Sequence, residues 1–370
     1  MTKAGKTTLK AIIFSLLGII GLIVLVLVGY VIYLSCTFYR IEDNQTLEVT
    51  NNQTSQVQLG EEYSLTTYNI GFGAYTHDFS FFMDSGEMLD GTKTQGSGSR
   101  AKDKQTVLDN TIGATLEILA MDTDFAFFQE VDTNSDRSFH VNQYEMLQNA
   151  FEGFSSSFAS NFHSGYLFYP ITNPHGALNS GIATFSKYAI EECVRRQFPI
   201  DMGFFTKFFD LDRCFEINRL NIANSEKQLV LINLHMSAYD EGGKIRARQL
   251  ELLNNVLTEE YAKGNYVIAG GDWNHDIANS INIFETEQKV PEWVAQLSAS
   301  DLPENFSFAT SDNAPTCRST DRPYEKGVNY SIVLDGFIVS NNVTVSTVQN
   351  IDTDFEFSDH NPVQLKFSLN

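Results

Sequence analysis

The chain is poor in cysteine and in basic side chains. Its 370 residues include four cysteines, too few for a scaffold held together by disulfides. Lysine and arginine together number 25 against 46 acidic residues, which gives a formal net charge of −21. This balance repels nucleic acid and anionic lipid at long range, and it disfavours a tight non-specific nucleic-acid binder unless a divalent cation concentrates positive charge at one site. It does not argue against a metal-dependent enzyme that acts on phosphate esters.

The sequence also lacks internal repeats of short period and, after residue 62, any low-complexity linker. Hydrophobic residues make up 42% of the chain, which is enough to bury a large core. We therefore expect residues 62–370 to form one domain. Within it, Cys193 and Cys214 lie in two consecutive strand-like runs. A cross-strand disulfide is one alternative for them, and buried free thiols are the favoured one.

The sequence does contain one long uncharged apolar run, residues 11–34, about the length that a helix needs to cross a bilayer. Three lysines lie within residues 1–10, whereas acidic residues dominate the stretch after the run. Because positive charge favours the cytoplasmic side, we expect a single-pass protein of the cell membrane with residues 1–10 in the cytoplasm and the domain outside. Residues 35–61 are polar and rich in Asn, Gln, Thr and Ser, which predicts a linker.

The apolar run has two other interpretations, a cleaved secretory signal and a lipoprotein signal that ends at Cys36. A cleavable signal has a shorter apolar core and small residues before the cut. Here the core is long, and the bulky Tyr33 precedes the cysteine. An uncleaved transmembrane helix is therefore favoured.

Apolar runs and helical spacing follow one another in a mixed order through the rest of the chain. Strands are predicted at 64–70, 125–128, 156–162, 181–185, 191–197, 214–222, 228–234 and 266–269. Helices are predicted at 102–119, 141–151 and 244–259, and a long glycine-rich loop at 71–98. This strand-rich, partly antiparallel pattern with helices in both halves predicts an α/β fold of two packed sheets flanked by helices.

Several strand-like runs end on polar residues of the types that bind metal ions or catalyse hydrolysis. The segments are Tyr68-Asn69-Ile70, Gln129-Glu130, Asn233-Leu234-His235, Gly271-Asp272-Trp273-Asn274 and Ser358-Asp359-His360. Strand ends that converge at one edge of a sheet hold side chains at fixed separations beside accessible loops. The pattern therefore indicates an enzyme.

These segments, together with Asn179-Ser180-Gly181 and Leu334-Asp335-Gly336, resemble in their order the signature of the endonuclease/exonuclease/phosphatase superfamily. Each segment is a weak signal alone, but the ordered set extends over most of residues 62–370. The resemblance implies a four-layer α/β sandwich that cleaves phosphoester bonds with Mg²⁺, with Mn²⁺ as the alternative metal.

Hydrolysis of a phosphoester requires a hard cation beside the phosphate oxygens, and Mg²⁺ prefers one or two carboxylate or amide oxygens plus waters. The resemblance makes Glu130 the principal metal ligand, with Asn69 assisting and Asp359 contributing from the opposite side of the ion. Taken alone, Asn69 is a strand-end amide that caps a turn. Within the set, the ligand role is favoured.

The water that attacks phosphorus needs a carboxylate beside it, and Asp272 fits this role, with Asn274 orienting it or the phosphate. The plainer alternative is a tight turn with an exposed aspartate. Charge that develops on the phosphate needs donors, a role that the resemblance gives to His360 paired with Asp335. His235 would be a second donor, although a lone strand-end histidine is more often a surface residue.

Two further features bear on the substrate. Arg318 either contacts phosphate through its planar guanidinium or lies solvated in a loop. A phenylalanine cluster either dips into a bilayer or belongs to the core. Its members are Phe204, Phe205, Phe208 and Phe209.

Three functions are compatible with these observations. The favoured one is a membrane-anchored, Mg²⁺-dependent phosphoesterase outside the cell, which hydrolyses phosphodiester or phosphomonoester bonds of lipid headgroups or small phosphate esters. The second is an extracellular nuclease of the same fold, which would need a basic groove that the acidic sequence gives little sign of. The third is a non-catalytic binding protein, which predicts lost site residues, whereas every core position is occupied.

Overall fold

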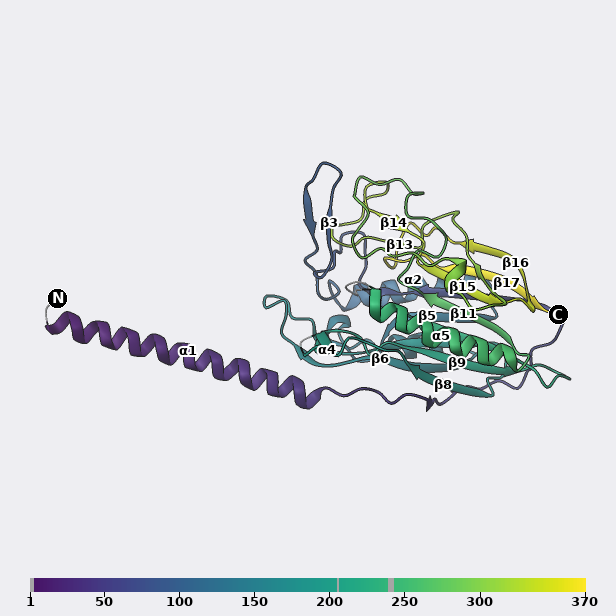
Figure 1. Ribbon diagram of the computed structural model, residues 1–370, viewed down its shortest axis with the longest axis horizontal. Helices are drawn as coiled ribbons and strands as arrows, with labels where there is room; N and C mark the ends of the chain where they lie inside the picture. Colours follow the sequence, from purple (N-terminus) through teal and green to yellow (C-terminus); the bar gives the residue numbers. More distant parts are fainter. Residues whose placement is uncertain (1–2, 205, 239–242) are drawn as a thin grey trace.

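The computed structural model describes residues 3–204, 206–238 and 243–370. Helix α1 (Lys3–Thr37) projects from the rest of the chain as a rod, with the N-terminus at its far end (Figure 1). Its segment Thr8–Thr37 is long and apolar enough to cross a membrane. The apolar run predicted at 11–34 therefore lies in one continuous helix, and the side of the membrane on which the domain lies stays a prediction.

Two mixed β-sheets form the body of the domain (Figure 1). The first has seven strands in the order β1 (Gln45–Thr46), β8 (Glu192–Gln197), β9 (Cys214–Asn221), β10 (Gln228–His235), β11 (Tyr266–Asp272), β15 (Asp335–Ser340) and β12 (Phe306–Ala309). The second has six strands in the order β16 (Val343–Asn350), β17 (Val363–Leu369), β2 (Glu62–Asn69), β5 (Phe125–Asp132), β7 (Gly176–Ser186) and β6 (Ser155–Leu167). Each sheet contains a parallel pair, β10 with β11 and β2 with β5, among antiparallel neighbours.

Alternation of side chains along each strand explains why the sheets stack. In β10, Leu229 and Leu231 belong to the core between the two sheets. Val230 and Ile232 point the other way and pack with helix α5 (Lys244–Ala262). This is the period of two that a strand buried on both faces requires, and each such buried side chain stabilises the fold by about 2 kcal/mol.

Helices α2 (Lys104–Ala120) and α3 (Gln143–Ala150) cover the outer face of the six-stranded sheet. Ile118 of α2 and Leu147 of α3 join Phe128 of that sheet in one apolar cluster. With α5 on the opposite side, the order of layers is helix, sheet, sheet, helix. The four-layer α/β sandwich expected from the sequence is confirmed.

Some elements were not predicted from the sequence. Strands β12, β15, β16 and β17 all lie after residue 300. Within the glycine-rich loop, β3 (Ser85–Glu87) and β4 (Lys93–Gln95) pair as a short hairpin, and later in the chain β13 (Cys317–Arg318) pairs with β14 (Ser331–Ile332). Strands of two or three residues bury too few side chains to leave a recognisable apolar run.

Residues 35–61, predicted as a linker, run along the domain. Strand β1 pairs with the edge strand β8, and Val57 is fully buried in the core between the sheets. The polar composition of this segment does not predict these contacts, because a few buried side chains are enough to hold a mostly polar segment against the domain.

The cysteines of the paired strands β8 and β9 do not face each other. The register sets Cys193 opposite Asn218, and Cys214 opposite Gln197. All four cysteines of the chain are free thiols. Cys193 and Cys214 are therefore buried free thiols, as favoured from the sequence.

A chain of buried hydrogen bonds crosses from one sheet to the other, and we name it the inter-sheet bridge. Gln129 of β5 donates through Nε2 to Oδ1 of Asn233 in β10 at 2.8 Å, and Asn233 donates through Nδ2 to the carbonyl of Ala183 at 2.9 Å. Thr184 of β7 donates to Oε2 of Glu216 in β9 at 2.6 Å. Burial raises the pKa of Glu216, which favours the neutral carboxyl inside the sandwich.

Removing one member of the bridge should destabilise the domain. Asn233→Ala takes a partner from Gln129 and from the Ala183 carbonyl, so we expect chemical denaturation to show a loss of about 2–4 kcal/mol in the free energy of unfolding. The control is Asn221→Ala, half-exposed at the far end of β9, which should change it by less than about 0.5 kcal/mol. Similar losses in both variants would show that the bridge does not hold the sheets.

Candidate active site

The parallel strand pairs bring four of the predicted residues to one edge of the sandwich. Strand β2 ends at Asn69, which lies opposite Gln129 of β5, and Glu130 comes next. Strand β10 ends at His235, opposite Asp272 at the end of β11. Because parallel strands end at the same edge of a sheet, residues far apart in the sequence converge there.

Asp335 reaches this edge because β15 runs antiparallel to β11 and starts where β11 ends. It is the register partner of Asp272. Gly271 lets the strands lie this close, since its φ is +142° and a Cβ atom on it would lie 2.0 Å from the Leu234 carbonyl oxygen of β10. Any larger residue would therefore push the two parallel strands apart at the site.

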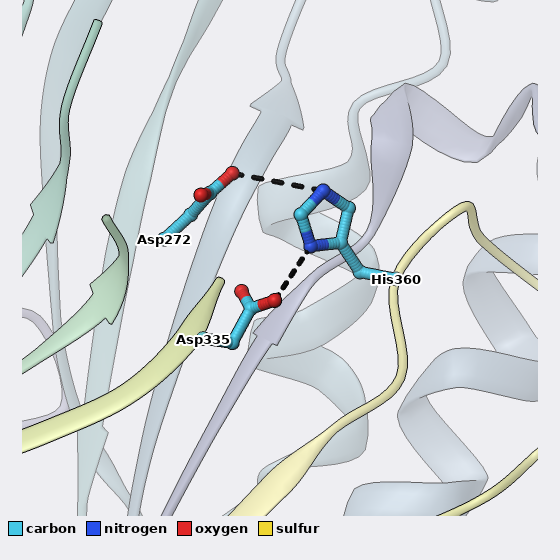
Figure 2. A group of neighbouring side chains, drawn as sticks. All are labelled: Asp272, Asp335 and His360. Carbon is cyan, nitrogen blue, oxygen red and sulfur yellow. Dashed lines mark hydrogen bonds and ion pairs between the residues drawn. The ribbon is translucent and has the colours of Figure 1, made fainter. Parts of the chain in front are cut away.

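His360 lies between two carboxylates (Figure 2). Its Nδ1 is 2.8 Å from Oδ2 of Asp335, and its Nε2 is 3.6 Å from Oδ2 of Asp272. Burial alone would lower the pKa of His360, but the two carboxylates raise it well above its ordinary value. This environment favours the protonated form of His360, and the residues that the resemblance pairs are in contact.

Asp272 stands at the centre of the polar cluster. Its Oδ2 accepts from Nδ2 of Asn69 at 2.9 Å and lies 3.4 Å from Nε2 of His235. Its Oδ1 accepts the backbone N–H of Asn274 at 2.9 Å. Burial raises the pKa of Asp272 to about 6, while the charge of His360 opposes the rise. A carboxyl group of this kind exchanges a proton near neutral pH.

The turn after β11 is fixed by its own side chains. Trp273 is fully buried and donates through Nε1 to the Gly336 carbonyl at 3.0 Å. Asn274 donates through Nδ2 to the Met236 carbonyl at 2.9 Å. Since Asp272 is only 1% exposed, the alternative of a turn with an exposed aspartate is wrong.

Glu130 occupies a β-bulge with a left-handed backbone. The register between β5 and β7 shifts between Phe128 and Val131, and φ of Glu130 is +55°. The bulge turns the side chain to the edge of the sheet, where Oε1 lies 3.4 Å from Nδ2 of Asn69. A non-glycine residue in this conformation costs roughly 1 kcal/mol, and such strain gathers at functional positions.

The three predicted metal ligands lie at this edge. Burial raises the pKa of Asp359 to about 7, Glu130 adds to the rise and His360 opposes it, although the residue as a whole is only half-buried. Asn69 directs Nδ2 at Glu130, while its Oδ1 accepts the N–H of Gly71 at 3.0 Å. Its amide would have to turn over to offer an oxygen. Crowded carboxylates with one amide form a donor set that suits a hard cation.

A second group of side chains is also able to bind a metal ion. Asp272, Asp335 and His360 each offer one ligand atom, and these atoms lie within 4.8 Å of one another. Nδ1 of His360 is already bonded to Asp335, so a cation inside this group would break that pair. The oxygen ligands Glu130 and Asp359 therefore remain the predicted position of the metal.

Arg213 also lies at the site and was not predicted from the sequence. Strand β9 runs antiparallel to β10, so the residue just before β9 lies beside His235 at the end of β10. Arg213 is 5% exposed, and its Nε and Nη1 have no hydrogen-bond partner among the described residues. Burial lowers the pKa of His235 well below its ordinary value, and Arg213 adds to this, so His235 is neutral. A charged residue directly before a buried run was the available signal.

Arg318 is buried rather than solvated. It is 2% exposed, and its Nη2 donates to the Thr76 carbonyl at 3.3 Å. Its guanidinium lies 5.1 Å from the ring centroid of Tyr324. The alternative of a solvated loop arginine is wrong.

The phenylalanine cluster divides between core and surface. Phe208 of α4 (Thr206–Phe209) is buried, whereas Phe204 and Phe209 are exposed. Phe205 lies outside the described residues.

Many of the side chains at this edge line a cavity of about 280 Å³. Its polar part includes Glu130, Asp272, His360, Arg213 and Arg318. Its apolar part includes Phe82, Tyr169 and Phe209. The cavity therefore combines acidic, cationic and aromatic walls, a lining that suits an amphiphilic anion.

A model of the Endonuclease/Exonuclease/phosphatase family matches residues 66–360. The match covers most of the chain and every predicted site residue, so the chain belongs to this family. Members of the family generally hydrolyse phosphoester bonds and depend on divalent metal ions. A comparison with curated proteins finds no match.

Several solved structures share the fold at low sequence identity. An endonuclease/exonuclease/phosphatase from Beutenbergia cavernae is 14% identical with a TM-score of 0.53, over 84% of this chain and 72% of that one. D. rerio TDP2 complexed with a single-strand DNA product is 12% identical with a TM-score of 0.51, over 83% and 99%. The human Nocturnin catalytic domain with a bound sulfate anion is 15% identical with a TM-score of 0.50, over 88% and 97%.

The backbone strain at Glu130 should lower the free energy of unfolding by a measurable amount. Glycine adopts a positive φ without steric cost, so Glu130→Gly should have a free energy of unfolding about 1 kcal/mol higher than Glu130→Ala, measured by chemical denaturation. Both variants lack the carboxylate, so their difference isolates the backbone. If alanine is as stable as glycine, the left-handed conformation of residue 130 is not strained.

Proposed function

We propose that this protein is a membrane-anchored phosphoesterase that depends on a divalent metal ion and acts outside the cell. Its substrate would be a phosphodiester or phosphomonoester of a lipid headgroup or a small phosphate ester. The observation that carries the proposal is the contact between Asp272 and the His360–Asp335 pair in the wall of a cavity that Glu130 also lines.

Glu130 and Asp359 would hold Mg²⁺, or Mn²⁺ in its place, with Asn69 as a further ligand once its amide oxygen faces the ion. When bound, the ion neutralises charge on the non-bridging phosphate oxygens. The raised pKa of Asp359, to which Glu130 contributes, supports this position, because a bound cation would offset the repulsion between the two carboxylates.

Asp272 would act as the base. A water oxygen attacks phosphorus, the ester P–O bond breaks, and the proton that Asp272 takes from the water passes to the leaving oxygen. The backbone N–H of Asn274 holds Oδ1 of Asp272 in place, which leaves Oδ2 facing His235, His360 and the amide of Asn69.

His360 and His235 would stabilise the charge that develops on phosphorus oxygens. His360 is cationic and oriented by Asp335, so its Nε2–H is a charged donor. The neutral form of His235, which burial favours, carries one ring N–H: on Nε2 this would donate to Asp272, and on Nδ1, which has no partner among the residues described, it would donate to the phosphate. Arg213 beside it would supply positive charge with free N–H groups.

A nuclease is the alternative within the same fold. D. rerio TDP2, which shares the fold, is complexed with a single-strand DNA product. The net charge of −21 weighs against an extended phosphate backbone in this chain, although the buried arginines offer charge for one phosphate. A non-catalytic binding role is disfavoured, because the catalytic residue types stand at every position of the motifs.

Hydrolysis should require both the metal and Asp272. We expect the full chain in detergent to cleave bis(p-nitrophenyl) phosphate or p-nitrophenyl phosphate with Mg²⁺ and to lose this activity in EDTA. Asp272→Asn keeps the shape but removes the base, so its rate should fall by at least about 100-fold. Release of p-nitrophenol is the readout.

The matched control is Asp109→Asn, on the exposed face of α2, which should keep the full rate. Single-stranded DNA is tested beside the two esters, and cleavage of DNA alone would favour the nuclease. Turnover that persists in EDTA, or full activity in Asp272→Asn, would contradict the proposal.

Asp359 should set the metal requirement. We expect Asp359→Asn to raise the Mg²⁺ concentration for the half-maximal rate by about tenfold, because one charged ligand is lost, with a smaller effect on KM for the ester. A titration of the initial rate with Mg²⁺ measures this. An unchanged requirement would remove Asp359 from the metal site.

A further inference from the structure

Six large apolar side chains are exposed on two neighbouring segments, the turn between β6 and β7 and the segment around α4. They are Phe168, Tyr169, Ile171, Met202, Phe204 and Phe209, and we name them the apolar rim. The segments meet through Leu167 and Phe208, which share one buried cluster. Ile171, 86% exposed, is the most exposed member. Apolar side chains gathered at a surface mark a contact site.

The rim is bonded to the C-terminal end of α1. Tyr30 donates through Oη to the Tyr166 carbonyl at 3.1 Å and accepts the N–H of Phe168 at 3.2 Å. Tyr33 accepts the N–H of Tyr166 at 2.9 Å. Gly165 permits this approach, because a Cβ atom there would lie 2.5 Å from a side-chain atom of α1. The β6–β7 turn is therefore held at a fixed height along the helix.

Helix α1 sets where a membrane lies relative to the rim. Its exposed apolar side chains run from Leu9 to Ile32, and these residues span about 36 Å, enough to cross a hydrocarbon core of about 30 Å. Tyr30 and Tyr33 lie at the C-terminal end of this run, and tyrosine favours the interface between lipid and water. Since Phe168 is bonded to Tyr30, the rim lies at the level of the headgroups.

The active-site cavity reaches the rim. Tyr169 and Phe209 belong to both, and Asp272 and His360 line the same cavity. Phe82 continues the apolar wall, with its ring centroid 5.7 Å from that of Tyr169. An aromatic passage thus joins the membrane level to the catalytic residues.

We propose that the apolar rim rests on the bilayer that α1 crosses and that the cavity takes a phospholipid from it. The phosphate of the headgroup lies in the catalytic part of the cavity beside His360, and the acyl chains stay along the rim. A bilayer is favoured over a protein partner because α1 brings it to the height of the rim. The choice of substrate rests on the proposed function, whereas the contact between rim and bilayer does not.

The position of the rim is tested first, without using activity. The full chains of Ile171→Trp and Leu59→Trp are reconstituted into phosphatidylcholine vesicles whose acyl chains carry bromine, a quencher of tryptophan fluorescence. Leu59 is also exposed but belongs to residues 35–61 along the domain, so the natural tryptophans contribute equally to both variants. Clearly stronger quenching in Ile171→Trp supports the contact. Equal quenching overturns it.

The substrate is tested with the reconstituted full chain, by headgroup release from phosphatidylcholine vesicles and by hydrolysis of soluble bis(p-nitrophenyl) phosphate. Ile171 does not line the cavity, so Ile171→Glu should slow headgroup release by about tenfold, the factor for one large apolar side chain, and leave the soluble ester unaffected. Leu59→Glu should change neither rate.

The outcomes separate the two proposals. Cleavage of the soluble ester without cleavage of phosphatidylcholine, phosphatidylglycerol or sphingomyelin overturns the lipid substrate and leaves the proposed function standing. Preference for single-stranded DNA over every lipid also overturns it. Equal loss of headgroup release in Ile171→Glu and Leu59→Glu removes the rim from the pathway. Failure to cleave any ester rejects the proposed function, while the quenching result still decides where the rim lies.

Discussion

The site depends on two separate sheets being held at one offset, because Glu130 belongs to one sheet and Asp272 to the other. Apolar packing between the sheets has no direction, and alone it tolerates a small slide. The inter-sheet bridge is directional and lies in a medium where an unpaired group is costly. Gln129 directly precedes Glu130, and Asn233 lies two residues before His235. The bond that fixes the sheets is thus adjacent to the groups that it must align.

Charge is distributed unevenly between the surface of the chain and the site. The chain is strongly acidic overall, yet Arg213, Arg318 and the imidazolium of His360 are buried together at one end of the sandwich. At long range the molecule repels an anion, whereas the cavity sets arginine side chains beside carboxylates, and charges of both signs are little screened there. For the proposed phosphoesterase, binding of a phosphate group would then depend on fit within the cavity rather than on attraction from a distance, which is consistent with a small headgroup rather than a long polyanion.

The central strands and the strand-end residues were predictable because both are local patterns, as at Asp272, which follows directly on an apolar run. Arg213 was missed because its place depends on the antiparallel pairing of β9 with β10, which no local pattern encodes. Strand β16 was missed because half of its side chains are exposed and polar. The contacts of residues 35–61 and of Gly165 with distant segments depend on tertiary packing, and the polar composition of the former suggested a free linker instead.

The bonds of Tyr30 and Tyr33 to the β6–β7 turn join the anchor and the domain into one rigid body. In a bilayer such a body undergoes rotational diffusion about the membrane normal and lateral diffusion in the membrane plane, whereas tilting of the domain and its dissociation from the surface are restricted. Under the proposal that the substrate is a phospholipid, enzyme and substrate would meet by lateral diffusion, so that the crowding and fluidity of the leaflet, rather than a concentration in solution, would set the encounter rate. Freezing of the acyl chains would then slow turnover even though every catalytic distance stays the same.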